Sequence, residues 1–336
     1  MEGQTVTLAV YNLVLTGMSS CLSIIGGIVI LVTYFTIREI QNFTRKLLVY
    51  LTLADLFTAV GNLTAVVRYA YAHDGKDHVA ENCTSVNKIT ENEYLCIGQS
   101  FVTTFSNLAS FLWTAVIAIH LWSSVIIRTR RTEVYYMHAL YHVLCWIVPL
   151  IIVLILLHKD CLGEDFCYGT GVWCGIKSNL PPQEIRTWMY IADIGWQIAC
   201  YLTACFLYIH LKFYLKLHHK SSQLASLSDT LRNEDENFVF VWMVIYLLKL
   251  WGFTRFFITT YADLDVLQQQ HMKGFLDFLL TMQSYGASGQ AFWNCILFCV
   301  LDKTVRKHLK AWILRCCNAG QERDRLLGDM STQEYC

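Results

Sequence analysis

The fold is predicted most directly by Cys96–Trp122, CIGQSFVTTFSNLASFLWTAVIAIHLW. This stretch carries no formal charge, and its 27 residues would, as a helix rising ~1.5 Å per residue, cross the ~30 Å hydrocarbon layer of a bilayer. Serine, threonine and asparagine recur along it; such side chains are costly against lipid but find partners against other helices. We therefore predict that this stretch is the central, third helix of a membrane-embedded bundle.

The composition supports a helical membrane protein along the whole chain. Of the 336 residues, 55% are hydrophobic and 15% are charged, against ~25% charged in soluble domains. Apolar runs long enough to span a bilayer fall at 8–36, 47–72, 95–123, 136–158, 187–214, 238–261 and 275–301. These predict an all-α membrane protein, a seven-transmembrane helix bundle whose surroundings are the lipid bilayer. The net charge of zero lends no support to a nucleic-acid partner.

The orientation follows from lysine and arginine in the connections. The first, third and fifth connections and the C-terminal tail hold 17 of these residues, whereas the N-terminus and the other connections hold six. Because the side rich in Lys and Arg faces the cytosol, we expect the N-terminus outside and the C-terminus inside. The first run follows no basic segment, so we expect a retained helix and not a signal peptide.

One glycosylation site fits this orientation. Asn82-Cys83-Thr84 is an acceptor sequon in a predicted outside loop, so Asn82 is the expected site.

Five of the 14 cysteines are expected outside, where an oxidising environment favours pairing. Cys96 begins the third helix and Cys174 lies midway through the second outside loop, which predicts a bridge between them. Cys161 and Cys167 form a local second candidate. This leaves Cys83 free or competing, and the odd number leaves open which of the five stays unpaired.

The expected segments are an extracellular N-terminus at 1–7, the transmembrane domain at 8–301, an amphipathic eighth helix on the inner leaflet at 302–317 and a flexible tail at 318–336. Apolar residues take one face of the eighth helix and basic residues another. Asp302 is its expected N-cap, and Cys316 and Cys317 are candidates for palmitoylation.

Charges inside the membrane are expensive, so each suggests a functional site. Asp55 and Asn294 lie at similar depth in the inner half of the bundle; their contact would be a switch element or simply interhelical glue. Nearer the outside we expect an Asp193–Arg255 ion pair, with Asp277 as a second acid within reach of Arg255, and a pocket for a small polar or zwitterionic ligand. The charges could instead only neutralise one another and fix packing. The expected pocket residues are Trp173, Trp188, Asp193, Trp196, Lys249, Phe253, Arg255 and Asp277.

An enzyme is the alternative from another class. His138 and His142 stand four residues apart on one helix face, a spacing that suits zinc, with His120 as a third ligand for a metal-dependent hydrolase. Both residues of the pair are equally at home near a membrane interface, so we expect no metal and no cofactor. A retinal pigment would need a lysine in the seventh helix, and 275–301 has none. A transporter would show repeated halves, which seven helices do not provide.

Several short motifs resemble G-protein-coupled receptors, and most closely the secretin/cyclic-AMP-receptor-like branch. The residues that carry the resemblance are Tyr50–Leu56 (YLTLADL), Thr104–Thr114 (TFSNLASFLWT), Val172–Cys174, Gly289–Ala291 and Asn294–Phe298 (NCILF). The chain departs from the rhodopsin-like class, because Ile126-Ile127-Arg128 stands where an acid-Arg-aromatic triplet is usual. The sixth-helix Pro-x-x-Gly kink of the secretin class is also missing, and Gly252 remains as the candidate hinge.

The resemblance implies a receptor without enzymatic activity that activates a heterotrimeric G protein, with the phospholipase-C-activating type as the candidate. An outward swing of the sixth helix would open a cytosolic cavity rimmed by His120, Arg128, Arg130, Arg131 and Lys216. The implied location is the plasma membrane, with the ciliary membrane as a variant of it. A structural membrane adaptor that does not signal is a further alternative.

Overall fold

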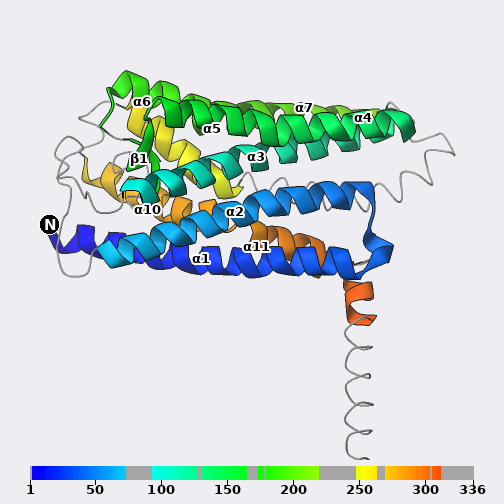
Figure 1. Cartoon of the computed structure of the whole chain (residues 1–336), viewed down its shortest axis with the longest axis horizontal. Coiled ribbons are helices and arrows are strands. Elements are labelled where there is room, and N and C mark those ends of the chain that lie inside the picture. The colour runs from blue at the N-terminus through cyan, green and yellow to red at the C-terminus, as the bar shows by residue number, and fades with distance from the viewer. Residues whose placement is uncertain are drawn as a thin grey trace, which may run out of the picture.

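The computed structural model describes residues 2–72, 93–126, 131–164, 173–177, 179–218, 247–262, 269–302 and 305–311. Its helices run side by side along one axis (Figure 1). In chain order they are α1 (Glu2–Thr36), η1 (Arg38–Ile40), α2 (Phe43–Ala72), α3 (Glu93–Ile126), α4 (Arg131–His142), η3 (Val143–Ile147), α5 (Val148–His158), α6 (Pro182–Met189), η4 (Tyr190–Ile194), α7 (Gly195–His218), α10 (Gln270–Ser288), α11 (Gln290–Cys295) and η5 (Ile296–Leu301), with further helices over 247–261 and 305–311.

Five helical segments within the described residues are long and apolar enough to cross a membrane. They are Val10–Thr36, Phe43–Tyr71, Tyr94–Ser124, Tyr136–His158 and Pro182–Tyr214, which confirms the first five predicted runs as helices. The sixth predicted run is described only from 247 onward. The seventh is divided at Gly289 into α10 and the shorter apolar piece Gln290–Leu301. Helix α1 begins at Glu2, earlier than predicted, because helical backbone continues beyond its apolar part.

Two of the spans contain a wide π-type turn, and each has a local cause. In the fourth span η3 ends two residues before Pro149, which has no N–H for the helical ladder. In the fifth span η4 carries Asp193, and Gly195 follows it. A Cβ on Gly195 would stand 2.6 Å from the Tyr190 carbonyl oxygen, so glycine permits this turn.

Helix α3 lies at the centre of the bundle, as predicted. It contacts α2, α5 and α7 and both strands of a small hairpin. Trp113 is fully buried in the inner core cluster, where it packs beside Tyr50 and Trp146. Leu108 belongs to a second cluster nearer the hairpin.

The hairpin closes one end of the bundle. Strands β1 (Leu162–Glu164) and β2 (Cys174–Ile176) pair antiparallel. A disulfide joins Cys174 to Cys96 at the start of α3, with their Cα atoms 5.5 Å apart. The Cys174 N–H also donates to Gln99 Oε1 (2.8 Å), and Ser100 Oγ donates to the Gly175 carbonyl (3.1 Å). The hairpin is thus fixed to α3 by three contacts.

The other end of the bundle holds the short helix 305–311, which turns away from the bundle axis (Figure 1). Asp302 caps it, since Val305 N–H donates to Asp302 Oδ1 (3.0 Å), as predicted. Asp302 also forms an ion pair with Arg45 of α2. Val305 is buried in an apolar cluster with Ile37 and Ile40, so this helix is docked on η1.

Candidate functional site

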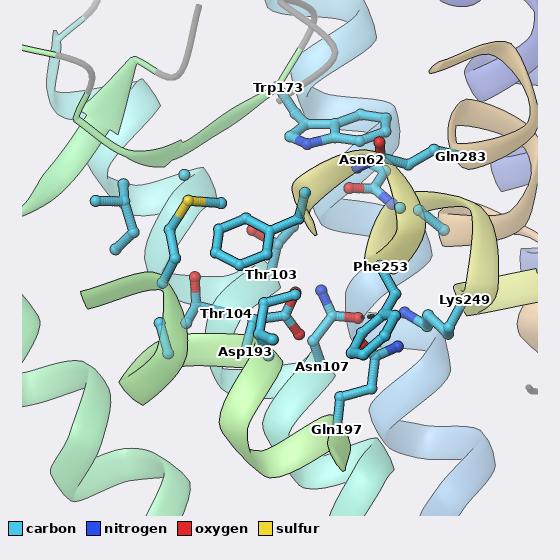
Figure 2. A pocket seen from close by; sticks show the side chains of 18 of the residues that line it. Asn62, Thr103, Thr104, Asn107, Trp173, Asp193, Gln197, Lys249, Phe253 and Gln283 are labelled. Carbon is cyan, nitrogen blue, oxygen red and sulfur yellow. Dashed lines mark hydrogen bonds between the residues drawn. The ribbon is translucent and has the colours of Figure 1, made fainter. Parts of the chain in front are cut away.

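A cavity of about 160 Å³ lies beneath the hairpin, between α3, η4, the helix 247–261 and α10. Figure 2 shows Trp173 above this cavity, with Asp193, Asn107 and Lys249 below it. Thr103, Thr104 and Asn107 of α3 supply one polar wall. The cavity is smaller than the ~300–1,000 Å³ of sites for drug-sized ligands, so it suits a small molecule with polar groups.

Lys249 brings a positive charge into this pocket from the sixth predicted span. Its Nζ donates to Asn107 Oδ1 (3.0 Å) and lies 5.3 Å from the centre of the Phe111 ring. Asp193 and Asp55 are the two carboxylates whose charge acts on Lys249. The expected Asp193–Arg255 ion pair is wrong among the described residues. Asp193 instead faces the cavity with Lys249.

Arg255 points elsewhere. Its Nη1 lies 3.4 Å from Gln283 Oε1, and its charge acts on Asp277 of α10. Neither Arg255 nor Asp277 lines the pocket, and Asp277 is exposed.

Four of the eight predicted pocket residues line the cavity, namely Trp173, Asp193, Lys249 and Phe253. The two remaining tryptophans have packing roles: Trp188 packs against the cluster beneath the hairpin, and Trp196 packs between the two core clusters. Depth in the membrane is readable from the sequence, but the direction in which a side chain points is not. For that reason the residues predicted from depth alone include some that face other helices.

Below the pocket, Asp55 lies at the centre of a buried polar network. Ser110 Oγ donates to Asp55 Oδ1 (2.7 Å) and Asn294 Nδ2 donates to Asp55 Oδ2 (2.9 Å). Gln290 Nε2 donates to Ser110 Oγ (2.8 Å). The predicted Asp55–Asn294 contact therefore exists. The network joins α2, α3 and α11.

Some residues of this region were missed by the sequence analysis. Asn107 and Gln290 carry the links just described, and Asn62 Nδ2 donates to Ser288 Oγ (2.8 Å) next to the cavity. The sequence did contain a signal for these residues, because a buried side-chain amide in an apolar helix needs a hydrogen-bond partner. Gly252 does line the pocket, where an added Cβ would lie 3.1 Å from the Gln283 side chain; its role as a hinge stays a prediction.

The histidines form an aromatic cluster at the inner end of α3. Nε2 of His142 lies 3.3 Å from Nε2 of His138. The Phe43 ring contacts both His120 (centroids 4.6 Å apart) and His138 (5.5 Å). Among the described residues, no three His, Cys, Asp or Glu side chains are grouped to hold a metal ion. The hydrolase alternative therefore finds no triad of ligands in this part of the chain.

The predicted cytosolic rim is only partly visible. His120 is half-buried near the end of α3, and Lys216 is exposed near the end of α7. Arg128 and Arg130 lie outside the described residues, as do Asn82, Cys83, Cys167, Cys316 and Cys317, and so does the side chain of Arg131.

One predicted bridge needs correction. Cys161 carries a free thiol, 2% exposed, whose Sγ donates to the Lys159 carbonyl (3.5 Å). The Cys161–Cys167 bridge is thus wrong. The reason is local, since Cys161 precedes β1 and its side chain packs inward under the hairpin.

The fold and the site together describe a helical, multi-pass membrane protein with a small polar pocket closed by a disulfide-anchored hairpin. The sequence profile described as slime mold cyclic AMP receptor matches residues 2–254. The chain therefore belongs to this family, whose members are receptors of the G-protein-coupled type.

Individual relatives extend the match over most of the chain. G-protein coupled receptor 157 of Mus musculus is 24% identical over 310 residues, which cover 89% of this chain and 84% of the relative. G-protein coupled receptor 157 of Homo sapiens is 24% identical over 300 residues, covering 87% and 81%. Cyclic AMP receptor-like protein A of Dictyostelium discoideum is 23% identical over 318 residues, covering 94% and 72%. The expected resemblance to the cyclic-AMP-receptor-like branch is confirmed.

Proposed function

We propose that the chain is a plasma-membrane receptor that binds a small polar ligand in the pocket beneath the hairpin and activates a heterotrimeric G protein. Under this proposal it has seven spans, an outside N-terminus and an amphipathic eighth helix on the inner leaflet. The chemistry is signal transmission and not catalysis. The phospholipase-C-activating type of G protein is the candidate partner.

The observation that carries the proposal is the position of Lys249. It lines the pocket, donates to Asn107 of α3, and lies within electrostatic reach of Asp55 in the inner network. A ligand that draws Lys249 toward itself would weaken its link to α3 and change the field at Asp55. Since a ligand shifts a two-state equilibrium only through different contacts in the two states, Lys249 supplies such a difference.

The cytosolic half of the proposal rests on the basic connection 127–131 and on the family. An outward movement of the sixth span would open a groove for a helix of the G protein, a common mode of peptide recognition. Arg128, Arg130 and Arg131 would line its rim with His120 and Lys216.

The test is signalling without added ligand. Calcium, inositol phosphate and cyclic AMP are measured in cells that express the wild type, Lys249→Ala or the control Lys273→Ala at equal surface level. Lys273 is exposed on α10 and does not line the pocket. We expect Lys249→Ala to change the basal signal by about fivefold or more, the scale of an allosteric coupling. Lys273→Ala should match the wild type.

Two results would contradict the proposal. One is the absence of a basal signal in every channel. The other is an equal response in both lysine variants. Replacing Arg128, Arg130 and Arg131 by alanine tests the rim separately, and coupling should then be lost at unchanged surface level.

A further inference from the structure

Asp193 is the acidic side chain among the described residues that line the pocket. Among the described residues its carboxylate makes no hydrogen bond and no ion pair, although Asp193 is half-buried in the cavity lining that α3, η4 and the helix 247–261 share. Several neighbouring polar side chains already have partners. Lys249 donates to Asn107, Asn62 donates to Ser288, and Gln197 donates to Tyr201 (3.0 Å). A carboxylate without a partner in such a place is costly, so Asp193 is prepared for a donor from outside the chain.

Lys249 stands opposite Asp193 in the same cavity. The two charges act on each other, but they do not meet as an ion pair. In Figure 2, Asn107 lies between them, with its hydrogen bond directed to Lys249. Two of the three Lys249 donors remain for an acceptor on a ligand.

The charge balance of the pocket narrows the ligand class. One acid and one base give the cavity a net charge of zero. A purely cationic ligand would satisfy Asp193 but leave an excess positive charge with Lys249, and a purely anionic ligand would do the reverse. An uncompensated charge in a site of low dielectric is strongly unfavourable. A ligand with both charges leaves neither side uncompensated.

The size of the cavity and its apolar walls restrict the class of ligand further. The cavity of about 160 Å³ admits a small molecule. Trp173 lies above the cavity (Figure 2), and Phe253 and Phe256 also belong to its lining. These rings offer aromatic surface to an apolar substituent or an ammonium group.

We propose that this pocket binds a small zwitterion, with its ammonium group at Asp193 and its carboxylate at Lys249, and that a free α-amino acid is the simplest such ligand. The zwitterion proposal names the ligand class of the proposed receptor, and its physiological meaning rests on that proposed function. Binding of the zwitterion itself does not require a G protein. No covalent chemistry is involved.

The experiment measures thermal unfolding of the purified full-length chain in detergent. Each of the twenty protein amino acids is added at about 5 mM, beside its N-acetyl form, which lacks the ammonium, and its amide, which lacks the carboxylate. A ligand that binds only the folded state raises the melting temperature. We expect at least one amino acid to raise it, and the two blocked forms of that amino acid to have little effect.

Variants of the two charged residues then test which of them the ligand contacts. Asp193→Asn and Lys249→Met keep size while removing charge, and each should weaken the binding of the active amino acid by about tenfold or more. Glu184→Gln on α6 and Lys273→Gln on α10 remove exposed charges outside the cavity and should leave the affinity unchanged. The comparison of blocked and free amino acids uses the wild type alone, so it holds even where a variant fails to fold.

The proposal is overturned if no amino acid raises the melting temperature, or if the blocked forms raise it equally. Its failure is distinguishable from failure of the receptor function. Basal signalling that depends on Lys249, without amino-acid binding, overturns the zwitterion proposal alone. Amino-acid binding without signalling in any channel supports the zwitterion and overturns the receptor function.

Discussion

Asp55 shows how one ionisable residue is accommodated inside this bundle. Its two carboxylate oxygens accept hydrogen bonds from Ser110 and Asn294, and it is 4% exposed. Three helices are thereby tied to one side chain. Asp193 has the opposite character, since it lines the cavity and its carboxylate has no partner in the part of the chain that the structure describes. This contrast distinguishes an acid with a structural role from an acid available to a ligand.

Cys161 gives a prediction at this scale. Burial raises the pKa of its thiol, and the nearby Glu184 and Asp160 carboxylates raise it further. Because the thiolate is the reactive form, we expect N-ethylmaleimide to label Cys161 at neutral pH only after unfolding. Mass spectrometry of labelled protein, kept without reductant, checks this. Recovery of Cys161 in a disulfide-linked peptide, or fast labelling of the folded protein, would contradict the structure.

At the scale of elements, the close approach of α10 and the helix 247–261 depends on Gly286. A Cβ there would lie 2.2 Å from the Leu248 carbonyl oxygen, whereas a Cβ at Gly274 on the same helix meets no atom within 4 Å. The carbonyl belongs to the residue before Lys249, so this contact also positions the pocket. The two glycines form a matched pair.

We therefore predict opposite effects of alanine at these glycines. Gly286→Ala should reduce the free energy of unfolding by about 1–3 kcal/mol, since backbone must move to relieve overpacking. Gly274→Ala should increase it by roughly 0.5–1 kcal/mol through helix propensity. Thermal unfolding of both variants in detergent measures the difference. A shift of the same sign in both would show that the helices are not packed as described.

Asp302 is the second test at the element scale, because it both caps the helix 305–311 and pairs with Arg45. Asp302→Ala should destabilise the protein by about 1 kcal/mol for the lost cap, and by more for the Arg45 charge left behind. Asp302→Asn retains a capping oxygen, so its loss should be smaller. Melting temperatures of the two variants report the order, and a smaller loss for alanine would exclude the capping role.

At the scale of the whole molecule, the distribution of lysine and arginine predicts the orientation. An epitope at the N-terminus should bind antibody on intact cells, and one at the C-terminus only after permeabilisation. Asn82→Gln should remove a glycan and lower the apparent mass. An accessible C-terminal epitope on intact cells would mean that the proposed topology is inverted, whereas unchanged mass in the variant would show that Asn82 carries no glycan.

Much of the architecture was determined by the sequence. The sequence predicted five features that the structure contains: five spans, the central position of α3, the Cys96–Cys174 bridge, the cap at Asp302 and the Asp55–Asn294 contact. Hydropathy depends only on the composition of each segment, so it can be calculated without knowing the tertiary structure. A residue's position within an apolar run then gives its depth in the bilayer. Residues at equal depth on neighbouring helices are natural partners, and Asp55 and Asn294 satisfy that rule.

Only the tertiary structure decided which charges face one another around the pocket. Depth alone offered Asp193 and Asp277 as partners of Arg255, but Asp193 faces Lys249 across the cavity, whereas the charge of Arg255 acts on Asp277 and its side chain lies beside Gln283. Each residue of a helix is rotated by roughly 100° from the one before, and the wide turn Tyr190–Ile194 changes that rotation within the fifth span. A partner is set by this rotation and by the packing of neighbouring helices, and neither is encoded in the hydropathy of a single segment.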